Sequence, residues 1–239
     1  MRRAALITGA SRGLGAELAT FLAGQDYDLV LTARGTDDLD AVARGMRDGG
    51  RRVMAIAGDV ADAEHRQRLI AAAERLGGLD LLVNNASELG PSPLLPLSEL
   101  PLPALERLFA VNVLAPLGLV QAALPLLAGR KGLIVNISSD AALGGYPGWG
   151  GYGASKAALD LLSATLANEL KERGVAVIAV DPGDMRTAMH QAAYPGEDIS
   201  NRPLPEVTIP FWAWLVGQAG SDVTGRRYRA QDATWEIAR

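Results

Sequence analysis

The chain has no cysteine and only two histidines among its 239 residues. The lack of cysteine excludes disulfides, thiol nucleophiles and thiolate metal sites. The two histidines, His65 and His190, are too few for a histidine-based metal cluster, so no metal is expected. His65 stands in the charged stretch AEHRQR and is expected at the surface. His190, next to Met189 in the expected lid, is also expected at the surface, with contact to a substrate as the alternative.

Long apolar runs and an excess of positive charge are missing as well. The longest apolar run, residues 114–128, contains Gln121 and two prolines and falls short of the roughly 20 residues that a membrane span needs. No signal peptide is visible, because Arg2 and Arg3 lead directly into the strand-like AALIT. The net charge of −4 gives no nucleic-acid footprint, and the basic stretch 225–229 is interpreted as a solvated turn. The sequence thus predicts a cytoplasmic protein that binds neither membranes nor nucleic acids.

Strand-like and helix-like segments alternate along the chain. Expected strands cover residues 4–8, 28–33, 53–58, 79–84, 132–138, 175–181 and 227–230. Expected helices cover residues 14–23, 36–48, 62–76, 104–114, 117–128 and 151–173, and an apolar helical patch is expected at residues 211–215. This order predicts an α/β fold: a Rossmann-type, doubly wound parallel sheet of about seven strands with helices on both faces. Residues 1–239 are expected to form a single domain, with residues 183–215 as a loop or lid over the site.

A glycine-rich turn, TGASRGLG at residues 8–15, separates the first strand from its helix. Glycines at 9, 13 and 15 permit a tight turn and close backbone approach, and the amides of the following helix can hold a pyrophosphate. The turn is therefore a candidate nucleotide site. A plain strand–helix turn without a ligand is the alternative.

The end of the second strand bears on which nucleotide could bind. NAD sites place an acid roughly 20 residues beyond the glycines, on the ribose 2′-hydroxyl. Here that region reads Thr32-Ala33-Arg34, and Arg34 would attract a 2′-phosphate, as would Arg12 in the turn. Two cations and no acid favour NADP(H) over NAD(H). Asp37 and Asp38 are the rival acids, but they suit the start of a helix better.

Three further groups of polar residues follow expected strands. Asp59 and Val60 follow the third strand and Asn84-Asn85-Ala86 ends the fourth, where the crevice of a doubly wound sheet binds ligands. An exposed strand-end acid and a plain turn, each without a ligand, are the alternatives. Ser139 follows the fifth strand, 13 residues before Tyr152. Lys156 lies four residues after Tyr152, so the phenol and the ammonium share one helix face. This arrangement favours moving a proton on and off an oxygen.

Together these motifs resemble the short-chain dehydrogenase/reductase family in its classical branch. The resemblance covers residues 4–187 and includes Asn112 in AVNV and Pro182-Gly183 followed by Thr187. It implies an NADP(H)-dependent carbonyl reductase or alcohol dehydrogenase with a Ser-Tyr-Lys-Asn site. Tyr152 would be the general acid/base, Lys156 would lower its pKa and bind the nicotinamide ribose, Ser139 would orient the substrate, and Asn112 would hold a water leading to Lys156.

The resemblance also implies a cofactor-binding set. Its members are Gly9, Ser11, Arg12, Gly13, Leu14, Gly15, Arg34, Asp59, Val60, Asn85, Tyr152, Lys156, Pro182, Gly183, Met185 and Thr187. Two positions depart from the family: Ser87 stands where glycine is usual, and Asp184 where an apolar residue is usual.

Two other functions remain open. One is a non-catalytic, nucleotide-sensing regulatory protein, although the Ser, Tyr and Lys that such proteins often lack are present. The other is an epimerase or dehydratase, although little chain after Thr187 is left for a substrate domain. The aromatic residues expected around the site suggest an apolar or aromatic carbonyl substrate; core or subunit-interface packing is the alternative for three of them, Phe211, Trp212 and Trp214. A homodimer or homotetramer is expected through residues 104–128 and 151–173.

Overall fold

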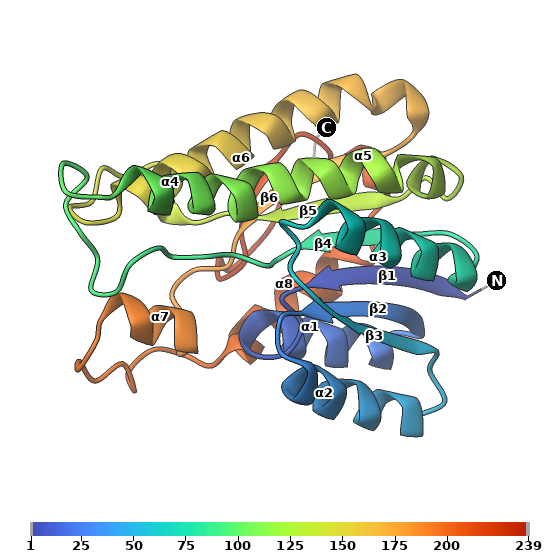
Figure 1. Cartoon of the computed structure of the whole chain (residues 1–239). Helices are drawn as coiled ribbons and strands as arrows, with labels where there is room; N and C mark the ends of the chain where they lie inside the picture. Colours follow the sequence, from blue (N-terminus) through green and yellow to red (C-terminus); the bar gives the residue numbers. More distant parts are fainter. Residues whose placement is uncertain (1, 238–239) are drawn as a thin grey trace.

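The computed structural model describes residues 2–237, which form one sheet of seven parallel strands in the order β3-β2-β1-β4-β5-β6-β7 (Figure 1). The strands are β1 (Arg3–Thr8), β2 (Tyr27–Ala33), β3 (Val53–Ala57), β4 (Leu81–Asn84), β5 (Leu133–Ile137), β6 (Ala176–Asp181) and β7 (Arg227–Arg229). Every ladder is parallel. The doubly wound parallel sheet predicted from the sequence is confirmed.

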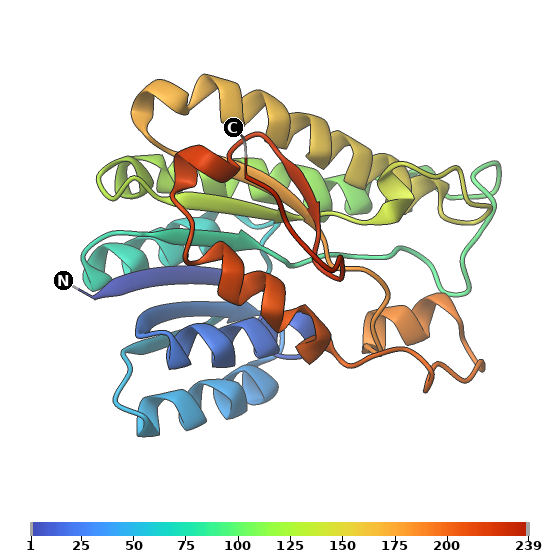
Figure 2. The ribbon, with the colours of Figure 1, turned by 180° about the vertical axis from the view of Figure 1, so that it is seen from behind.

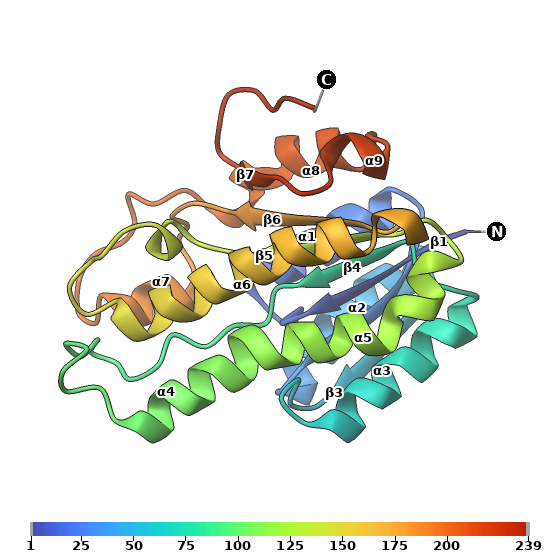
Figure 3. The ribbon, with the colours of Figure 1, turned by 90° about the horizontal axis from the view of Figure 1, so that it is seen from above.

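Helices cover both faces of this sheet. One face carries α1 (Gly13–Gly24), α2 (Thr36–Asp48), α8 (Ile209–Leu215) and α9 (Gly220–Val223), as Figure 2 shows. The other carries α3 (Ala63–Leu76), α4 (Leu102–Phe109), α5 (Ala115–Ala128) and α6 (Gly150–Glu169), seen from above in Figure 3. Side chains alternate across a strand, so Ala5 and Ile7 of β1 join the first core and Ala4 and Leu6 the second.

The two helices expected at residues 104–114 and 117–128 are one continuous helix. A π-helical turn, Ala110–Leu114, joins α4 to α5 where the sequence predicted a break at Pro116. Proline is tolerated in the first turn of α5, and it has no N–H to give to the carbonyl oxygen of Asn112 four residues earlier. The combined helix, Leu102–Ala128, is long and apolar enough to cross a membrane by length and composition, and half of its most apolar window is buried inside the protein.

Residues 183–215, expected to be a loop or lid, divide into two parts. The helix α7 (Ala188–Ala193) was not predicted; it starts where the Thr187 hydroxyl accepts a hydrogen bond from the backbone N–H of His190. In Figure 1 α7 lies beyond the carboxyl ends of the strands. The later helix, α8, belongs to the core: Phe211 and Trp212 are fully buried. The Phe211 ring packs against those of Trp212, Trp214, Tyr228 and Trp235, which is the core alternative for these aromatic residues.

His65 is buried, so its expected surface position was wrong. Its Nε2 lies 2.7 Å from the hydroxyl of Thr32, and a side chain at Gly58 would collide with its ring. Burial and the nearby charge of Arg68 lower the pKa of His65, which favours the neutral ring. Charged neighbours along a helix do not reveal which face turns toward a sheet.

The helix α2 starts at Thr36 as expected, but its N-cap is Gly35, which has no side chain to cap the first turn. Asp37 and Asp38 lie in that turn, where their charges favour the positive end of the helix dipole. They therefore stabilise the helix start by charge rather than by capping.

Two glycine-to-alanine substitutions distinguish the effect of close packing on stability from the effect of helix propensity. A Cβ at Gly15 would overlap the carbonyl oxygen of Gly9 and lie 2.6 Å from Asn85 Nδ2, whereas a Cβ at Gly45 meets nothing within 4 Å. We expect Gly15→Ala to destabilise the protein by about 1–3 kcal/mol. Gly45→Ala, in exposed α2, should stabilise it by about 0.5–1 kcal/mol. Urea unfolding measures the stability of both variants. Equal changes of the same sign would contradict the close packing at Gly15.

Candidate active site

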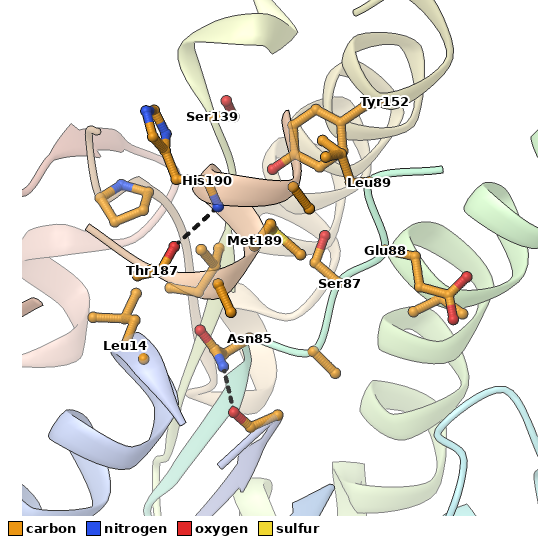
Figure 4. A pocket seen from close by; sticks show the side chains of 18 of the residues that line it. Leu14, Asn85, Ser87, Glu88, Leu89, Ser139, Tyr152, Thr187, Met189 and His190 are labelled. Atoms are coloured by element: carbon orange, nitrogen blue, oxygen red, sulfur yellow. Dashed lines mark hydrogen bonds between the residues drawn. The ribbon is translucent and has the colours of Figure 1, made fainter. Parts of the chain in front are cut away.

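A cavity of about 1140 Å³ lies at the carboxyl edge of the sheet. The turn after β1 and the ends of β2 and β3 line one end, and the residues after β5, the start of α6 and α7 line the other. In Figure 4 Leu14 and Asn85 lie at the lower end, Ser139 and Tyr152 at the upper end, and Met189 between them. The cavity exceeds the upper range of about 1,000 Å³ for common ligand sites, which leaves room for more than one small molecule.

Hydrogen bonds from β4 fix the glycine turn at the lower end. Asn85 Nδ2 donates to the carbonyl oxygens of Thr8 (2.8 Å) and Gly9 (3.2 Å). The Thr8 hydroxyl accepts from the backbone N–H groups of Asn85 and Ala86, both at 2.9 Å. Gly9 and Gly13 adopt positive φ angles of 66° and 55°, which favour glycine. Gly15 does not line the cavity but packs behind the turn, against Gly9.

Four charged side chains, from the segments after β2, β3 and β4 and from α4, meet beside this turn. The Arg34 guanidinium donates to Glu88 at 2.8 Å, and Arg107 donates to both Glu88 oxygens and, at 2.7 Å, to Asp59. All four residues line the cavity. Partial burial would raise the pKa of Asp59, but the hydrogen bonds from the Ala61 backbone and Arg107 outweigh it and lower that pKa. Glu88, acting mainly by its hydrogen bond, raises the pKa of Arg107.

Three hydroxyl groups meet at the upper end. Tyr152 is 8% exposed, and its phenol interacts with the hydroxyls of Ser139 and Ser87. Ser139 also accepts from the backbone N–H of Ala141 at 3.2 Å, which fixes it at the end of β5. The Ser138 hydroxyl is buried and has no hydrogen-bond partner among the residues that the structure describes. Ser139 rather than Ser138 is thus placed to act with Tyr152.

Burial shifts the two titratable groups of α6 in opposite directions. It raises the pKa of Tyr152 to about 12 and lowers that of Lys156 to about 8. Lys156 Nζ donates to the carbonyl oxygen of Ile137 at 2.8 Å and lies 5.5 Å from the centre of the Tyr152 ring. Burial is the largest cause of the raised phenol pKa, and the lowering expected from Lys156 remains a prediction.

Asn112 is connected to the site by hydrogen bonds to the backbone of Glu88 and to the hydroxyls of Ser87 and Ser155. Its Oδ1 accepts from the N–H of Glu88 (2.8 Å) and from the Ser87 hydroxyl (3.1 Å). Its Nδ2 donates to the Glu88 carbonyl oxygen (2.9 Å) and to the Ser155 hydroxyl (3.0 Å). The side chain is 1% exposed and does not line the cavity, so these contacts position the chain after β4.

Comparison with known proteins decides the family. The family described as short chain dehydrogenase matches residues 3–198 of this chain. The chain belongs to this family. It is 34% identical, over 96% of its length and 92% of the relative's, to an uncharacterized oxidoreductase of Escherichia coli K12.

Solved structures show the same fold. A short chain dehydrogenase from Shigella flexneri complexed with NADP superposes with a TM-score of 0.89 at 33% identity, covering 96% of this chain and 97% of the other. One from Escherichia coli CFT073 complexed with NADPH gives a TM-score of 0.87 at 33% identity, covering 96% and 97%. The chain is also 34% identical to the 3-oxoacyl-(acyl-carrier-protein) reductase of Staphylococcus aureus, over 87% of this chain and 84% of that protein.

Most of the residues predicted from the sequence line the cavity of this short-chain dehydrogenase. They are Gly9, Ser11, Arg12, Gly13, Leu14, Arg34, Asp59, Val60, Asn85, Ser139, Tyr152, Lys156, Pro182, Gly183, Met185 and Thr187. Gly15 and Asn112 lie behind its wall. The unusual Ser87 places a third hydroxyl at the tyrosine.

Arg227 is a residue that the sequence analysis missed. Its guanidinium donates to the carbonyl oxygen of Ser139 (2.8 Å), to Asp181 (3.2 Å) and to Asp160 (3.0 Å). The stretch 225–229 is therefore not a solvated turn, since β7 ties the end of β5 to β6 and α6. Asp181 is 3% exposed and raises the pKa of Tyr152, so Arg227 balances a charge beside the phenol. The sequence could have indicated Arg227 only if Asp181 or Asp160 had been identified as a buried acid that needs a cationic partner.

The other wall of the upper end is aromatic and apolar. The Trp149 ring centre lies 5.8 Å from that of Tyr152 and 6.2 Å from that of Tyr194. Leu89 and Met189 pack in the same cluster, and Met189 lies central in Figure 4. His190 also lines the cavity, against Tyr194 and near Asp184, so its expected surface position was wrong. Asp184 faces His190 and Arg202.

Lys156→Met should change stability in a pH-dependent way. An ammonium whose pKa falls from 10.5 to about 8 opposes folding by up to about 3 kcal/mol at pH 7. We expect Lys156→Met to resist urea better than the wild type at pH 7. Between pH 8 and pH 10.5 the native amine is neutral while the unfolded one still holds its proton, so the wild type gains stability as the pH rises and the difference shrinks.

Exposed Lys171 provides the control, because Lys171→Met should show no such pH dependence. A Lys156→Met protein less stable than the wild type at pH 7, or a difference constant from pH 7 to pH 10, would contradict the desolvation of Lys156.

Proposed function

We propose that this protein is an NADP(H)-dependent oxidoreductase that moves a hydride between the cofactor and a carbonyl compound or its secondary alcohol. The observation that carries the proposal is that one cavity joins the glycine turn and Arg34 at one end to Ser139, Tyr152 and Lys156 at the other. The relatives from Shigella flexneri and Escherichia coli, complexed with NADP and NADPH, support the choice of cofactor.

The lower end of the cavity fits a dinucleotide. No side chain stands at Gly9 or Gly13, and a Cβ at Gly9 would lie 2.9 Å from Asn85 Nδ2, so the backbone itself forms the wall. The N-terminus of α1 has no side-chain cap, which leaves its amides to a pyrophosphate. Arg12 and Arg34 line this end and would hold the 2′-phosphate, while Asp59 and Val60 would flank the adenine.

At the upper end Tyr152 is the general acid/base. When bound, the cofactor would supply the hydride and, in its oxidised form, a positive charge. With a pKa of about 12, the phenol is protonated at neutral pH and is ready to donate to a substrate oxygen in the reductive direction. The Ser139 hydroxyl would hold that oxygen, and Lys156 would bind the nicotinamide ribose. In the oxidative direction, the cationic charges of Lys156 and the cofactor favour the tyrosinate.

Proton supply would run through the π-helical turn, Ala110–Leu114. The carbonyl oxygen of Asn112 lies in the π-helical turn, and Pro116 has no N–H to offer it. That oxygen would hold the water that connects Lys156 to solvent. The side chain of Asn112 is already committed to Glu88 and Ser155.

The substrate is an apolar or aromatic carbonyl compound. Trp149, Tyr194, Leu89 and Met189 surround the space beside Tyr152 and provide flat, apolar surface rather than charge. A ring or an alkyl chain would bind favourably against such a wall because its apolar surface would be buried there.

The protein is also proposed to form a homo-oligomer through α4, α5 and α6. Leu102 and Leu161 are 71% exposed and Leu114 59% exposed, which leaves apolar surface on these helices. Sedimentation should give a species larger than the 25.1 kDa chain, and a monomer at micromolar concentration would contradict the assembly.

Turnover tests the function. NADPH oxidation followed by absorbance over a panel of apolar ketones and aldehydes should detect activity in the wild type. Tyr152→Phe removes the proton donor and should lower kcat by at least about 100-fold while NADPH still binds. Wild-type protein that binds NADPH but turns over no member of the panel would favour the sensor function.

A further inference from the structure

Glu88 stands where the proposed cofactor's 2′-phosphate would bind. Its Oε1 accepts from Arg34 Nη1 at 2.8 Å, so the cation that would bind the phosphate already has an anionic partner. The Glu88 side chain is only 20% exposed, whereas that of Arg34 is 65% exposed. The Glu88 carboxylate is thus largely enclosed by the protein, while the Arg34 guanidinium contacts it from the solvent-exposed side.

The position of Glu88 is fixed by its backbone. Its N–H donates to Asn112 Oδ1 and its carbonyl oxygen accepts from Asn112 Nδ2, at 2.8 and 2.9 Å. Asn112 is almost fully buried. Both sides of the Glu88 residue are therefore anchored, and the carboxylate has a restricted range of positions within reach of Arg34.

Arg107 gives Glu88 a second partner that does not depend on Arg34. Arg107 Nε donates to Glu88 Oε2 at 3.1 Å and its Nη2 to Oε1 at 2.9 Å, a two-pronged contact. Glu88 can therefore release Arg34 and stay paired. The exposed Arg34–Glu88 contact is the weaker one, and it is the one that a phosphate would replace.

We propose that Glu88 competes with the 2′-phosphate of NADP(H) for Arg34 and so limits the preference of the protein for NADP(H) over NAD(H). This inference rests on the proposed NADP(H) function. Binding of NADP(H) breaks the Arg34–Glu88 pair and leaves Glu88 on Arg107. NAD(H) has no phosphate there, so its binding leaves the pair intact. Glu88 is in this way a specificity-determining residue.

Titration of NADPH and NADH, by cofactor fluorescence or calorimetry, tests this. The isosteric Glu88→Gln frees Arg34 from an ion pair worth up to about 1 kcal/mol, so the Kd for NADPH should fall about fivefold. The Kd for NADH should stay unchanged. In an Arg34→Ala background, the same Glu88→Gln change should no longer tighten NADPH, because the contested cation is gone.

Glu106→Gln is the matched control. Glu106 is exposed on α4 next to Arg107, does not line the cavity, and its loss changes the net charge equally. It should leave both Kd values unchanged. Melting curves of each variant verify folding.

Three results would overturn the inference: an unchanged or weaker NADPH affinity in Glu88→Gln, equal tightening of NADPH and NADH, or tightening that persists without Arg34. Weaker NADH binding in Glu88→Gln would overturn it as well, because Glu88 would then act as an acceptor for the ribose hydroxyl. If wild-type protein binds neither cofactor, the proposed function fails rather than this inference.

Discussion

The site depends on the hydrogen bonds that tie the turn after β1 to the end of β4. The sheet order changes direction between these two strands, since β2 and β3 lie on one side of β1 and β5, β6 and β7 lie beyond β4. Ligands of doubly wound sheets bind at such a reversal. Thr8 and Asn85 bridge it by exchanging side-chain and backbone hydrogen bonds. They hold the glycine turn open, and both ends of the cavity are built out from it.

At the upper end of the cavity, two titratable groups that the proposed chemistry needs are buried at an energetic cost. Burial raises the pKa of the Tyr152 phenol and lowers that of the Lys156 ammonium, so the neutral form of each group is favoured. Neighbouring charges limit the cost: Asp160 stabilises the Lys156 ammonium, and Arg227 in turn holds Asp160 and Asp181. A charge network at the lower end similarly balances two carboxylates against two guanidiniums. Both ends of the cavity thus contain charged side chains that are paired with opposite charges.

The sequence predicted the elements whose pattern is local. The buried strands β5 and β6 are apolar runs, and the glycine turn and the Tyr152–Lys156 spacing are short motifs, so each could be placed without tertiary information. What it missed depends on contacts between distant segments. His65 is buried because Gly58 and Thr32 meet it, Arg227 is held by acids from two other elements, and α7 is a single short helix after Thr187. The hydrogen bond between the Asn112 side chain and the backbone of Glu88, 24 residues away, is a contact of the same kind, and the water expected at Asn112 remains a proposal for its backbone carbonyl oxygen.

The central claim is that one cavity couples hydride transfer to proton transfer by Tyr152. Isotope transfer tests it most directly: NADPH deuterated at the nicotinamide C4 position is incubated with a reducible apolar ketone, and the alcohol is analysed by mass spectrometry. The account predicts an alcohol that carries the deuterium on its carbinol carbon, formed by the wild type and at greatly reduced rate by Tyr152→Phe. Unlabelled alcohol from both C4 epimers of the cofactor, or equal rates for the two proteins, would contradict it.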